Sequence, residues 1–303
     1  MSESVNLIIR KRTGLVKKSI YEIVSVVQDF RSRVIGGIKT GILLWESVVI
    51  PFLIHNSSSW LKIKQNDMDA LNRLQNLFLN HLLGVQNCPA LMMMWDLGIL
   101  PMPLRLLKEK LMLYFHICSL PASSIAHQVL LQQELLHLPS LRDEVKHFLQ
   151  RYEVTDVKSF SKAKWKVFVR DKIHQMGREY LLEGMRKYKK VDLLELSLEE
   201  YQLKEYFSSM TLEFSRLTFR RRSLTMNTCR MHYRNTQRFI SDAFACFSCK
   251  SASPGHPKIE QLSHWVSCPR YSQFHISDSV IKSDVELCEI YKQVINYRRE
   301  NEE

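Results

Sequence analysis

Apolar residues recur at helical spacing along most of this sequence, and few glycines or prolines interrupt them. There are nine glycines and nine prolines among 303 residues. A helix buries one stripe of side chains with a period of about 3.6 residues, whereas a strand alternates with a period of about two. No alternating pattern of useful length occurs. The spacing therefore predicts an all-α fold, with at most a small irregular or β-ribbon element around the cysteines near the C-terminus.

The first well-marked helix is predicted to follow Asp67. An aspartate at this position can accept hydrogen bonds from the free amides of the first turn. Gly84 can end the helix, because glycine readily takes the left-handed conformation of a helix C-terminus. The apolar side chains between these two residues share one face, namely Leu71, Leu74, Phe78 and Leu82.

Two prolines mark the starts of the next helices. Pro89 opens a short helix that Gly98 ends, and Pro103 opens a longer one, because proline suits the first turn. The methionines at 92–94 and Trp95 could form a binding surface. At this spacing we instead expect them to be core residues.

Changes in composition divide the chain into three predicted regions. Residues 1–120 form an apolar helical region, and residues 121–209 keep the helical periodicity with a strongly charged surface. Residues 210–303 hold an Arg-rich segment, a cysteine cluster and a terminal helix. The charged run at residues 162–190 is predicted to be a solvated helix, with contact to a phosphate backbone as the alternative.

The charge of the chain favours polyanionic partners. The net charge is +12 and the isoelectric point is near 9.4, which favours nucleic acid first and an anionic membrane surface second. The N-terminus lacks the apolar core of a secretory signal, so we expect an intracellular protein, nuclear or cytoplasmic. The most apolar run, residues 41–54, carries Glu46 and Pro51 and is too short to span a bilayer.

Arginines are concentrated between residues 216 and 241, where no acidic residue occurs. Phe219, Tyr233 and Phe239 are interleaved with them. Guanidinium groups bind phosphate through paired hydrogen bonds, and aromatic rings can stack on exposed bases. A helix face that is merely basic is the alternative. The segment predicts a nucleic-acid interface with seven arginines, namely Arg216, Arg220, Arg221, Arg222, Arg230, Arg234 and Arg238.

The seven cysteines are unevenly distributed. Cys88, Cys118 and Cys288 are isolated in apolar or helical patterns and are predicted to act as small buried hydrophobes. The other four fall within residues 229–268. In a reducing compartment, such clustering indicates a metal site rather than disulfides.

The cysteine cluster has the spacing of a structural zinc site. Two cysteines separated by two residues can direct both sulfurs to one ion, and a spaced His and Cys can complete a tetrahedron. A second possible pair, Cys229 and His232, lies upstream, and His256 is a less favoured third option. Protein ligands would fill all four coordination positions of the zinc ion, so we assign it no catalytic role. The favoured zinc ligands are Cys246, Cys249, His264 and Cys268.

Other catalytic motifs are absent from the sequence. It contains no Gly-rich phosphate loop, no nucleophile elbow and no two-histidine metalloprotease motif. Reasoning from the residues alone therefore predicts a basic, helical, zinc-containing nucleic-acid-binding protein.

The order of several segments resembles the C-terminal part of the reverse-transcriptase polyprotein of non-LTR (LINE-like) retrotransposons. Residues 13–30 resemble the stretch after the palm, and residues 70–118 resemble the helical thumb-like region. Residues 48–63 resemble a family segment that contains a proline and a tryptophan, here Pro51 and Trp60. The C-terminal part resembles the family's Arg-rich segment, Cys-Cys-His-Cys motif and closing helix, in FRRRSLTMN, CFSC, HWVSCPRYSQF and SDVELCEIYKQVINYRRE.

This resemblance implies a non-catalytic fragment of a reverse transcriptase. The fingers and palm, with the paired aspartates that hold magnesium, would lie before residue 1, so we expect no polymerase activity from this chain alone. The implied partners are RNA, DNA and the fingers–palm part of a reverse transcriptase, and the implied cofactor is structural zinc. The alternatives are a helical scaffold module and a relic without function. Exposure of Trp45, Trp60 and the methionines would support the scaffold module.

Overall fold

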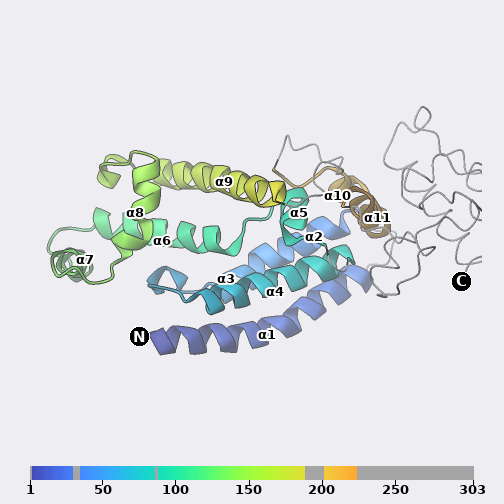
Figure 1. The fold of residues 1–303 in the computed structure, drawn as a ribbon, viewed down its shortest axis with the longest axis horizontal. Coiled ribbons are helices and arrows are strands. Elements are labelled where there is room, and N and C mark those ends of the chain that lie inside the picture. The colour runs from blue at the N-terminus through green and yellow to red at the C-terminus, as the bar shows by residue number, and fades with distance from the viewer. Residues whose placement is uncertain (1, 30–34, 86–87, 188–200, 224–303) are drawn as a thin grey trace, which may run out of the picture.

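A computed structural model of the chain describes residues 2–29, 35–85, 88–187 and 201–223. These residues form helices and connecting turns, with one isolated bridge between Ile35 and Thr211 (Figure 1). The predicted all-α fold class is confirmed. The element predicted around the cysteines lies outside the described residues.

The described helices form an elongated body. In Figure 1, α7 and α8 lie at one end of this body and α10 and α11 at the other. The elements are α1 (Ser2–Asp29), α2 (Gly37–Leu44), the π-helix η1 (Trp45–Val49), α3 (Ile50–Leu53), the 3₁₀ helix η2 (Ser57–Ser59), α4 (Gln65–Leu83), α5 (Ala90–Leu97), α6 (Met102–Ser119), α7 (Ile125–Leu135), α8 (Leu141–Arg151), the 3₁₀ helix η3 (Val157–Ser159), α9 (Lys162–Arg186), α10 (Tyr206–Ser209) and α11 (Leu212–Arg222).

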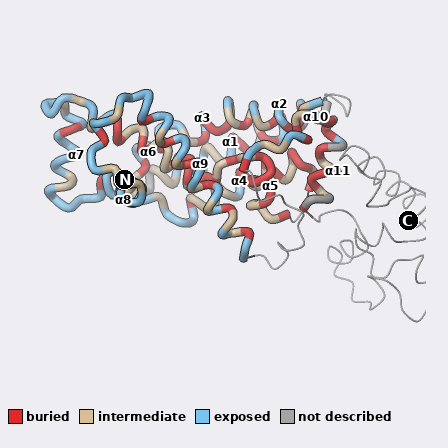
Figure 2. Tube along the Cα trace, turned by 90° about the horizontal axis from the view of Figure 1, so that it is seen from above, coloured by how far each residue is buried: buried red, intermediate tan, exposed pale blue. Residues whose placement is uncertain are grey.

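A first hydrophobic core is built by helices α1 to α5 together with α10, α11 and the ends of α6 and α9. Trp45 stacks on Phe78 at its centre, with ring centroids 4.3 Å apart. The methionines at 92–94 and Trp95 are buried in it, as predicted. Figure 2 shows the buried residues concentrated in this part of the body.

A second hydrophobic core lies between α6, α7, α8 and the first half of α9. Trp165 is fully buried, stacks on Phe115 and donates a hydrogen bond from its indole nitrogen to the carbonyl oxygen of Leu111, at 3.2 Å. Residues on both sides of the predicted boundary at residue 120 contribute to this core.

Helix α9 joins the two cores. Its buried residues recur every four positions: Trp165, Val169, Ile173, Gly177, Leu181 and Met185. Four residues turn a helix about 40° past one full turn, at about 100° per residue, so this row winds gradually around the helix. The first half of the row consequently faces the second core, and Leu181 and Met185 face the first.

The ends of the central helices match the sequence prediction with one exception. Helix α4 begins at Gln65, with Lys64 as its N-cap, and the Asp67 amide donates to the Lys64 carbonyl oxygen. The prediction that Asp67 caps this helix is therefore wrong, because Asp67 lies inside the first turn. The predicted apolar face is confirmed, since Leu71, Leu74, Phe78 and Leu82 are all buried.

Glycine ends α5 where another segment passes close by. Pro89 is the N-cap of this helix and Gly98 ends it with a φ of 64°. A Cβ atom at Gly98 would lie 2.7 Å from the backbone nitrogen of Leu203. Pro103 lies in the first turn of α6, as predicted.

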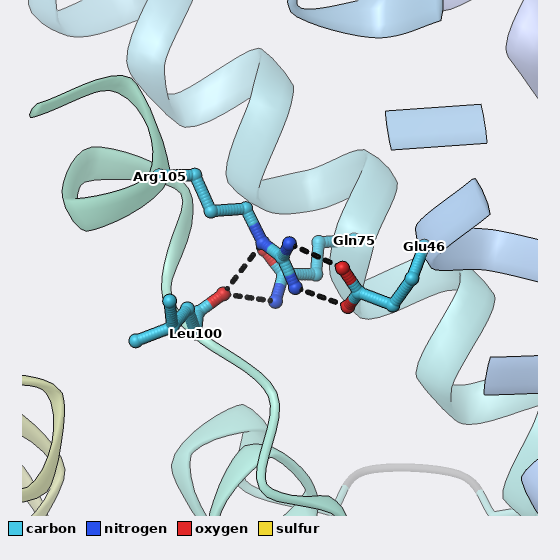
Figure 3. A network of polar contacts seen from close by, with 4 residues as sticks. All are labelled: Glu46, Gln75, Leu100 and Arg105. Carbon is cyan, nitrogen blue, oxygen red and sulfur yellow. Dashed lines mark hydrogen bonds and ion pairs between the residues drawn. The ribbon is translucent and has the colours of Figure 1, made fainter. Parts of the chain in front are cut away.

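A buried polar network fixes α6 against η1 (Figure 3). The Arg105 guanidinium donates two hydrogen bonds to the Glu46 carboxylate, at 2.7 and 2.5 Å. Its Nε and the Gln75 amide both donate to the carbonyl oxygen of Leu100, at 3.0 Å each. Glu46 thus has a structural partner inside the body, which explains a charge within the most apolar run of the sequence.

Among the described helices, no single one is long and apolar enough to cross a membrane. The pair α5 and α6, bent by 55° at their junction, satisfies length and composition together.

Candidate nucleic-acid interface

The positive charge of the chain is concentrated before residue 224. Residues 224–303 contain ten Lys and Arg against nine Asp and Glu, a surplus of one. The first 223 residues therefore contain 33 of the 43 Lys and Arg and 22 of the 31 Asp and Glu, a surplus of eleven. The part of the chain before residue 224 therefore carries most of the surplus positive charge that could attract a polyanion.

Helix α9 carries five basic residues in one row beside its buried row. Lys166, Arg170, Arg178 and Arg186 each follow a residue of the buried row by one position, and Lys162 follows the N-cap Ser161. The two rows therefore run side by side and wind around the helix together. All five side chains are exposed, as is His174, which lies in the middle of the row. We call this set the basic row: Lys162, Lys166, Arg170, Arg178 and Arg186.

The acidic residues of α9 lie next to the basic row, but two of the three have cationic partners outside it. Glu179 pairs with Arg151 at the end of α8, and Glu183 pairs with Lys187 at 3.0 Å. Asp171 pairs with Arg170 at 2.9 Å. Within the described part of the chain, Arg170 is the member of the basic row for which an ion pair is found.

In the basic row, Arg178 and Arg186 each follow the preceding member by eight residues, about 12 Å along the helix axis, whereas Lys162, Lys166 and Arg170 are four residues, about 6 Å, apart. Like charges at this spacing destabilise a helix by about 0.2–0.5 kcal/mol per pair. A phosphate bound between them relieves this repulsion and gains charge-assisted hydrogen bonds. The row can therefore bind a phosphodiester backbone by electrostatic attraction.

The first two arginines of the Arg-rich segment contact the protein itself. Arg216 and Arg220 lie on α11 and extend to the C-terminal end of α4. Arg216 donates from Nε to the Leu82 carbonyl oxygen at 2.9 Å and from Nη2 to that of His81 at 3.1 Å. Arg220 donates to the carbonyl oxygen of Gly84.

These contacts complete a helix end. The last carbonyl groups of a helix have no amide partner within it, and guanidinium groups are well placed to bind them and to oppose the negative end of the helix dipole. Burial, and secondly the neighbouring Arg220, lower the pKa of Arg216 from its usual high value. We conclude that Arg216 and Arg220 tie α11 to α4.

The other predicted interface residues fall outside what the structure describes. This applies to Arg230, Arg234 and Arg238, and to the side chains of Arg221 and Arg222. The same is true of every predicted zinc ligand and alternative ligand, namely Cys246, Cys249, His264, Cys268, Cys229, His232 and His256. Within the described ranges, no group of three or more His, Cys, Asp or Glu side chains could hold a metal ion.

The two described cysteines are not placed for chemistry. Cys88 is buried, as predicted, and burial raises the pKa of its thiol to about 12. Cys118 is half-buried, and burial raises its pKa as well. A thiol reacts as its thiolate, so neither is activated as a nucleophile.

Comparison with known proteins identifies no relative: no family model, no curated protein and no solved structure matches this chain.

Counting in fours from Trp165 gives the buried row, and the basic row is recognised only by its place beside it. The sequence at residues 162–190 predicts only a solvated helix, because its charges are distributed along the whole stretch. Without the buried row as a reference, the exposed flank that collects Lys162, Lys166 and Arg170 is not distinguishable from the flank that carries Lys164 and Lys172.

Proposed function

We propose that this chain is a non-catalytic nucleic-acid-binding protein, comparable to the C-terminal part of a non-LTR reverse transcriptase. The observation that carries the proposal is the exposed basic row of α9, on a body that holds nearly all of the surplus charge. The zinc site at Cys246, Cys249, His264 and Cys268 and the arginines beyond Arg222 would add a second contact region, as the resemblance implies.

The roles of the described arginines refine this proposal. Arg216 and Arg220 are engaged with α4, so they contribute by fixing the start of the Arg-rich segment rather than by contacting a ligand. The ligand contacts would come from α9 and from arginines later in the chain. Structural zinc would be held by thiolates and one imidazole and would supply no catalysis.

Binding of the full chain to RNA and DNA tests the proposal. We compare the wild type with a row variant that combines Lys162→Gln, Lys166→Gln, Arg170→Gln and Arg178→Gln. A control variant removes the same charge from exposed positions of α1, which lies on the opposite side of the body from α9 in Figure 1. The control combines Arg10→Gln, Lys11→Gln, Lys17→Gln and Lys18→Gln.

We expect dissociation constants of about 1–100 μM near physiological salt and binding that weakens steeply with added salt, because bound cations release counterions from the nucleic acid. The row variant should bind on the order of 100-fold more weakly near physiological salt, and the α1 variant less than about threefold more weakly. Binding of the wild type that stays constant from low to high salt, or no binding at all, would contradict the proposed function.

A second candidate function, a helical protein-interaction module, is favoured by α7. The residues whose exposure would have supported it, Trp45, Trp60 and the methionines at 92–94, are buried. Leu130 of α7 is buried, but four other apolar side chains of this helix are exposed, with Ile125 at 80% and Leu135 at 78%. The other two are Val129 and Leu131. Figure 2 shows α7 largely exposed. Exposed apolar patches of this kind often mark partner contacts.

Sedimentation velocity separates the two candidates. A scaffold module should self-associate through α7, and addition of a fingers–palm fragment of a non-LTR reverse transcriptase should replace that association with a one-to-one complex. A combined variant with Ile125→Ser and Leu135→Ser should then lose both associations. A wild-type protein that stays monomeric and does not bind the fragment would count against this second candidate.

A further inference from the structure

We propose that residues 280–297 of this chain dock as a helix on an exposed apolar stripe that α1 shares with η1 and α3. These residues lie outside those that the structure describes. The inference goes beyond the proposed function and does not depend on nucleic-acid binding. It is carried by the exposed stripe, by the amphipathic pattern of residues 280–297 and by the charges of both.

Helix α1 has a second row of residues beside its buried row. Residues of this second row recur every three or four positions, so they follow one flank of the helix. Arg12 belongs to the row and donates hydrogen bonds to the carbonyl oxygens of Leu53 and His55, at 3.3 and 2.5 Å. The flank that carries the row therefore faces the end of α3. Its apolar members are all exposed, namely Ile8, Leu15 and Val26.

The stripe continues on the helical segment that packs beside α1. Gly41 of α2 faces α1, because a Cβ atom there would lie 3.4 Å from Cγ2 of Val27. Leu44, Val48 and Phe52 extend this row at a spacing of three or four residues. Leu44 is half-buried, whereas Val48 and Phe52 are exposed. We call the combined set the apolar stripe: Ile8, Leu15, Val26, Leu44, Val48 and Phe52.

The sequence of residues 280–297 predicts a helix with one apolar face. Leu287, Tyr291 and Val294 are spaced by four and three residues, and Cys288 and Ile295 lie beside them. Such a helix gains most of its stability by packing its apolar face against another surface. The opposite face is polar, with Glu286, Glu289, Gln293 and Asn296.

The predicted helix and the apolar stripe have similar lengths. At about 1.5 Å per residue, residues 280–297 extend about 26 Å, and the part of α1 from Ile8 to Val26 extends about 27 Å. Helix α7 also exposes apolar side chains, but it has eleven residues and lies at the opposite end of the body from α11 (Figure 1). The stripe is therefore the better match of the two surfaces.

The predicted helix can reach the stripe from the end of the described chain. The last described helix, α11, begins beside α2, because a Cβ atom at Gly37 would lie 3.5 Å from Cβ of Leu212. Residues 224–279 connect α11 to the predicted helix, and an extended chain spans about 3.3 Å per residue. A tethered segment binds at an effective concentration in the millimolar range. This favours the chain's own segment over a second copy.

Charge also favours the predicted helix over a second copy. Lys11 and Lys18 are exposed and neighbour Leu15 on the surface of α1, and Lys18 pairs with Glu22 at 3.9 Å. Residues 278–291 carry four acidic residues and one lysine. A symmetric contact between two stripes would instead bring the lysines of both copies into one interface. Exposed ion pairs contribute little affinity, so burial of apolar side chains provides most of it.

Cys288 provides a direct test in the full chain, because it lies on the apolar face of the predicted helix. A cysteine introduced into the stripe should form a disulfide with it in oxidised glutathione. We compare Leu15→Cys and Val48→Cys with the control Ile125→Cys, at an exposed apolar position of α7. Docking raises the local concentration of Cys288, so the stripe variants should form this disulfide at least about tenfold faster than the control. Peptide mass spectrometry of the monomer identifies the bond.

Hydrogen exchange tests docking without introduced cysteines. Amides of residues 285–297 should exchange at least about tenfold more slowly in the full chain than in a peptide of the same sequence, because a docked helix opens rarely. A stripe variant should lose this protection, and a matched α7 variant should retain it. Protection of the α4 amides shows that both variants stay folded. The stripe variant combines Leu15→Ser, Val48→Ser and Phe52→Ser, and the α7 variant combines Ile125→Ser, Leu131→Ser and Leu135→Ser.

The outcomes distinguish the possible occupants of the stripe. Absence of protection in the wild type, or equal loss of protection in the two variants, would overturn the inference. Disulfides that link two molecules would assign the stripe to a second copy. Vesicles of phosphatidylcholine and phosphatidylserine that bind the wild type but not the stripe variant would assign it to a membrane surface, and either result would also overturn the inference. The proposed function is tested separately by the row variant of α9.

Discussion

Helices α9 and α11 are both rich in basic residues, yet the described arginines of the two helices have different partners. On α11, Arg216 and Arg220 donate to carbonyl oxygens at the end of α4. On α9, the basic row is exposed. The comparison teaches that a basic stretch is a candidate ligand surface only where the protein offers its cations no acceptors.

The difference arises from what each helix faces. Gly84 ends α4 in the left-handed conformation, with a φ of 60°, and the last carbonyl groups of α4 are open to the side chains of α11. Lys162 and Lys166 lie in the first turns of α9, where the Ser161 side chain caps the free amides. The positive end of the helix dipole lies there and repels cations, so this terminus offers Lys162 and Lys166 no acceptor.

The comparison is tested most strongly by removing one arginine from each helix. Arg216→Ala should lower the free energy of unfolding by about 2–3 kcal/mol, because two carbonyl groups lose a charged donor. Arg170→Ala should change it by less than about 0.5 kcal/mol, as expected of an exposed side chain with a surface ion pair. Urea denaturation followed by circular dichroism measures both.

Arg216→Lys is the matched control for this experiment. A lysine keeps the charge but has one donor nitrogen, so it should recover part of the loss. Arg216→Ala should leave the salt slope of nucleic-acid binding unchanged for the folded protein. A smaller slope would place Arg216 in the ligand interface and would end the contrast between α9 and α11.

Gly84→Ala tests the same junction from the side of α4. A non-glycine residue is strained at this φ, and its Cβ would lie 3.1 Å from Nη2 of Arg220 and 3.3 Å from Nε of Arg216. We expect a loss of about 1–2 kcal/mol in the free energy of unfolding. In the background of Arg216→Ala the loss should be smaller, because one of the crowded side chains is absent. Equal losses in both backgrounds would show that backbone strain alone causes the destabilisation.

Helix α8 provides a weaker test, because its end is capped locally rather than by another helix. The Ser140 side chain accepts from the Asp143 amide and the Asp143 carboxylate accepts from the Ser140 amide. Ser140→Ala should cost about 1 kcal/mol, and it should have no effect on nucleic-acid binding. Thermal unfolding of this variant gives the value.

The pH dependence of this cap has a defined sign. Hydrogen bonds from the Ser140 backbone and then from its side chain lower the pKa of Asp143. The Asp143 carboxylate therefore contributes fully to the free energy of unfolding above the ordinary carboxyl pKa of about 4. This contribution is lost as the pH falls through the lower pKa that Asp143 has in the folded protein. The difference in melting temperature between wild type and Asp143→Asn should be present near pH 6 and should disappear at acid pH. A difference that grows on acidification would exclude this cap as its source.

Much of the fold could be predicted because local signals agree with the packing. Leu71, Leu74, Phe78 and Leu82 have one spacing and one buried face, and Gly84 and Gly98 end helices where the sequence predicts it. Asp67 was misassigned because an aspartate suits both the N-cap and the first turn of a helix. Here the N-cap is Lys64, three residues before Asp67.

The candidate interface was less predictable because it depends on distant partners. The contact of Arg216 with α4 joins residues 134 positions apart, and nothing in the Arg-rich segment indicates an acceptor there. The basic row required the buried row as a reference, and that row is shared between two cores. The zinc ligands and the arginines beyond Arg222 stay predictions.

The four-residue repeat of α9 also constrains how the length of this chain can change. One inserted residue between Ile173 and Leu181 would rotate the second half of the helix by about 100° relative to the first. Leu181 and Met185 would then leave the first core, or Trp165 and Val169 the second. Insertions and deletions among related chains are therefore expected outside α9, and the helix itself should accept substitutions at constant length.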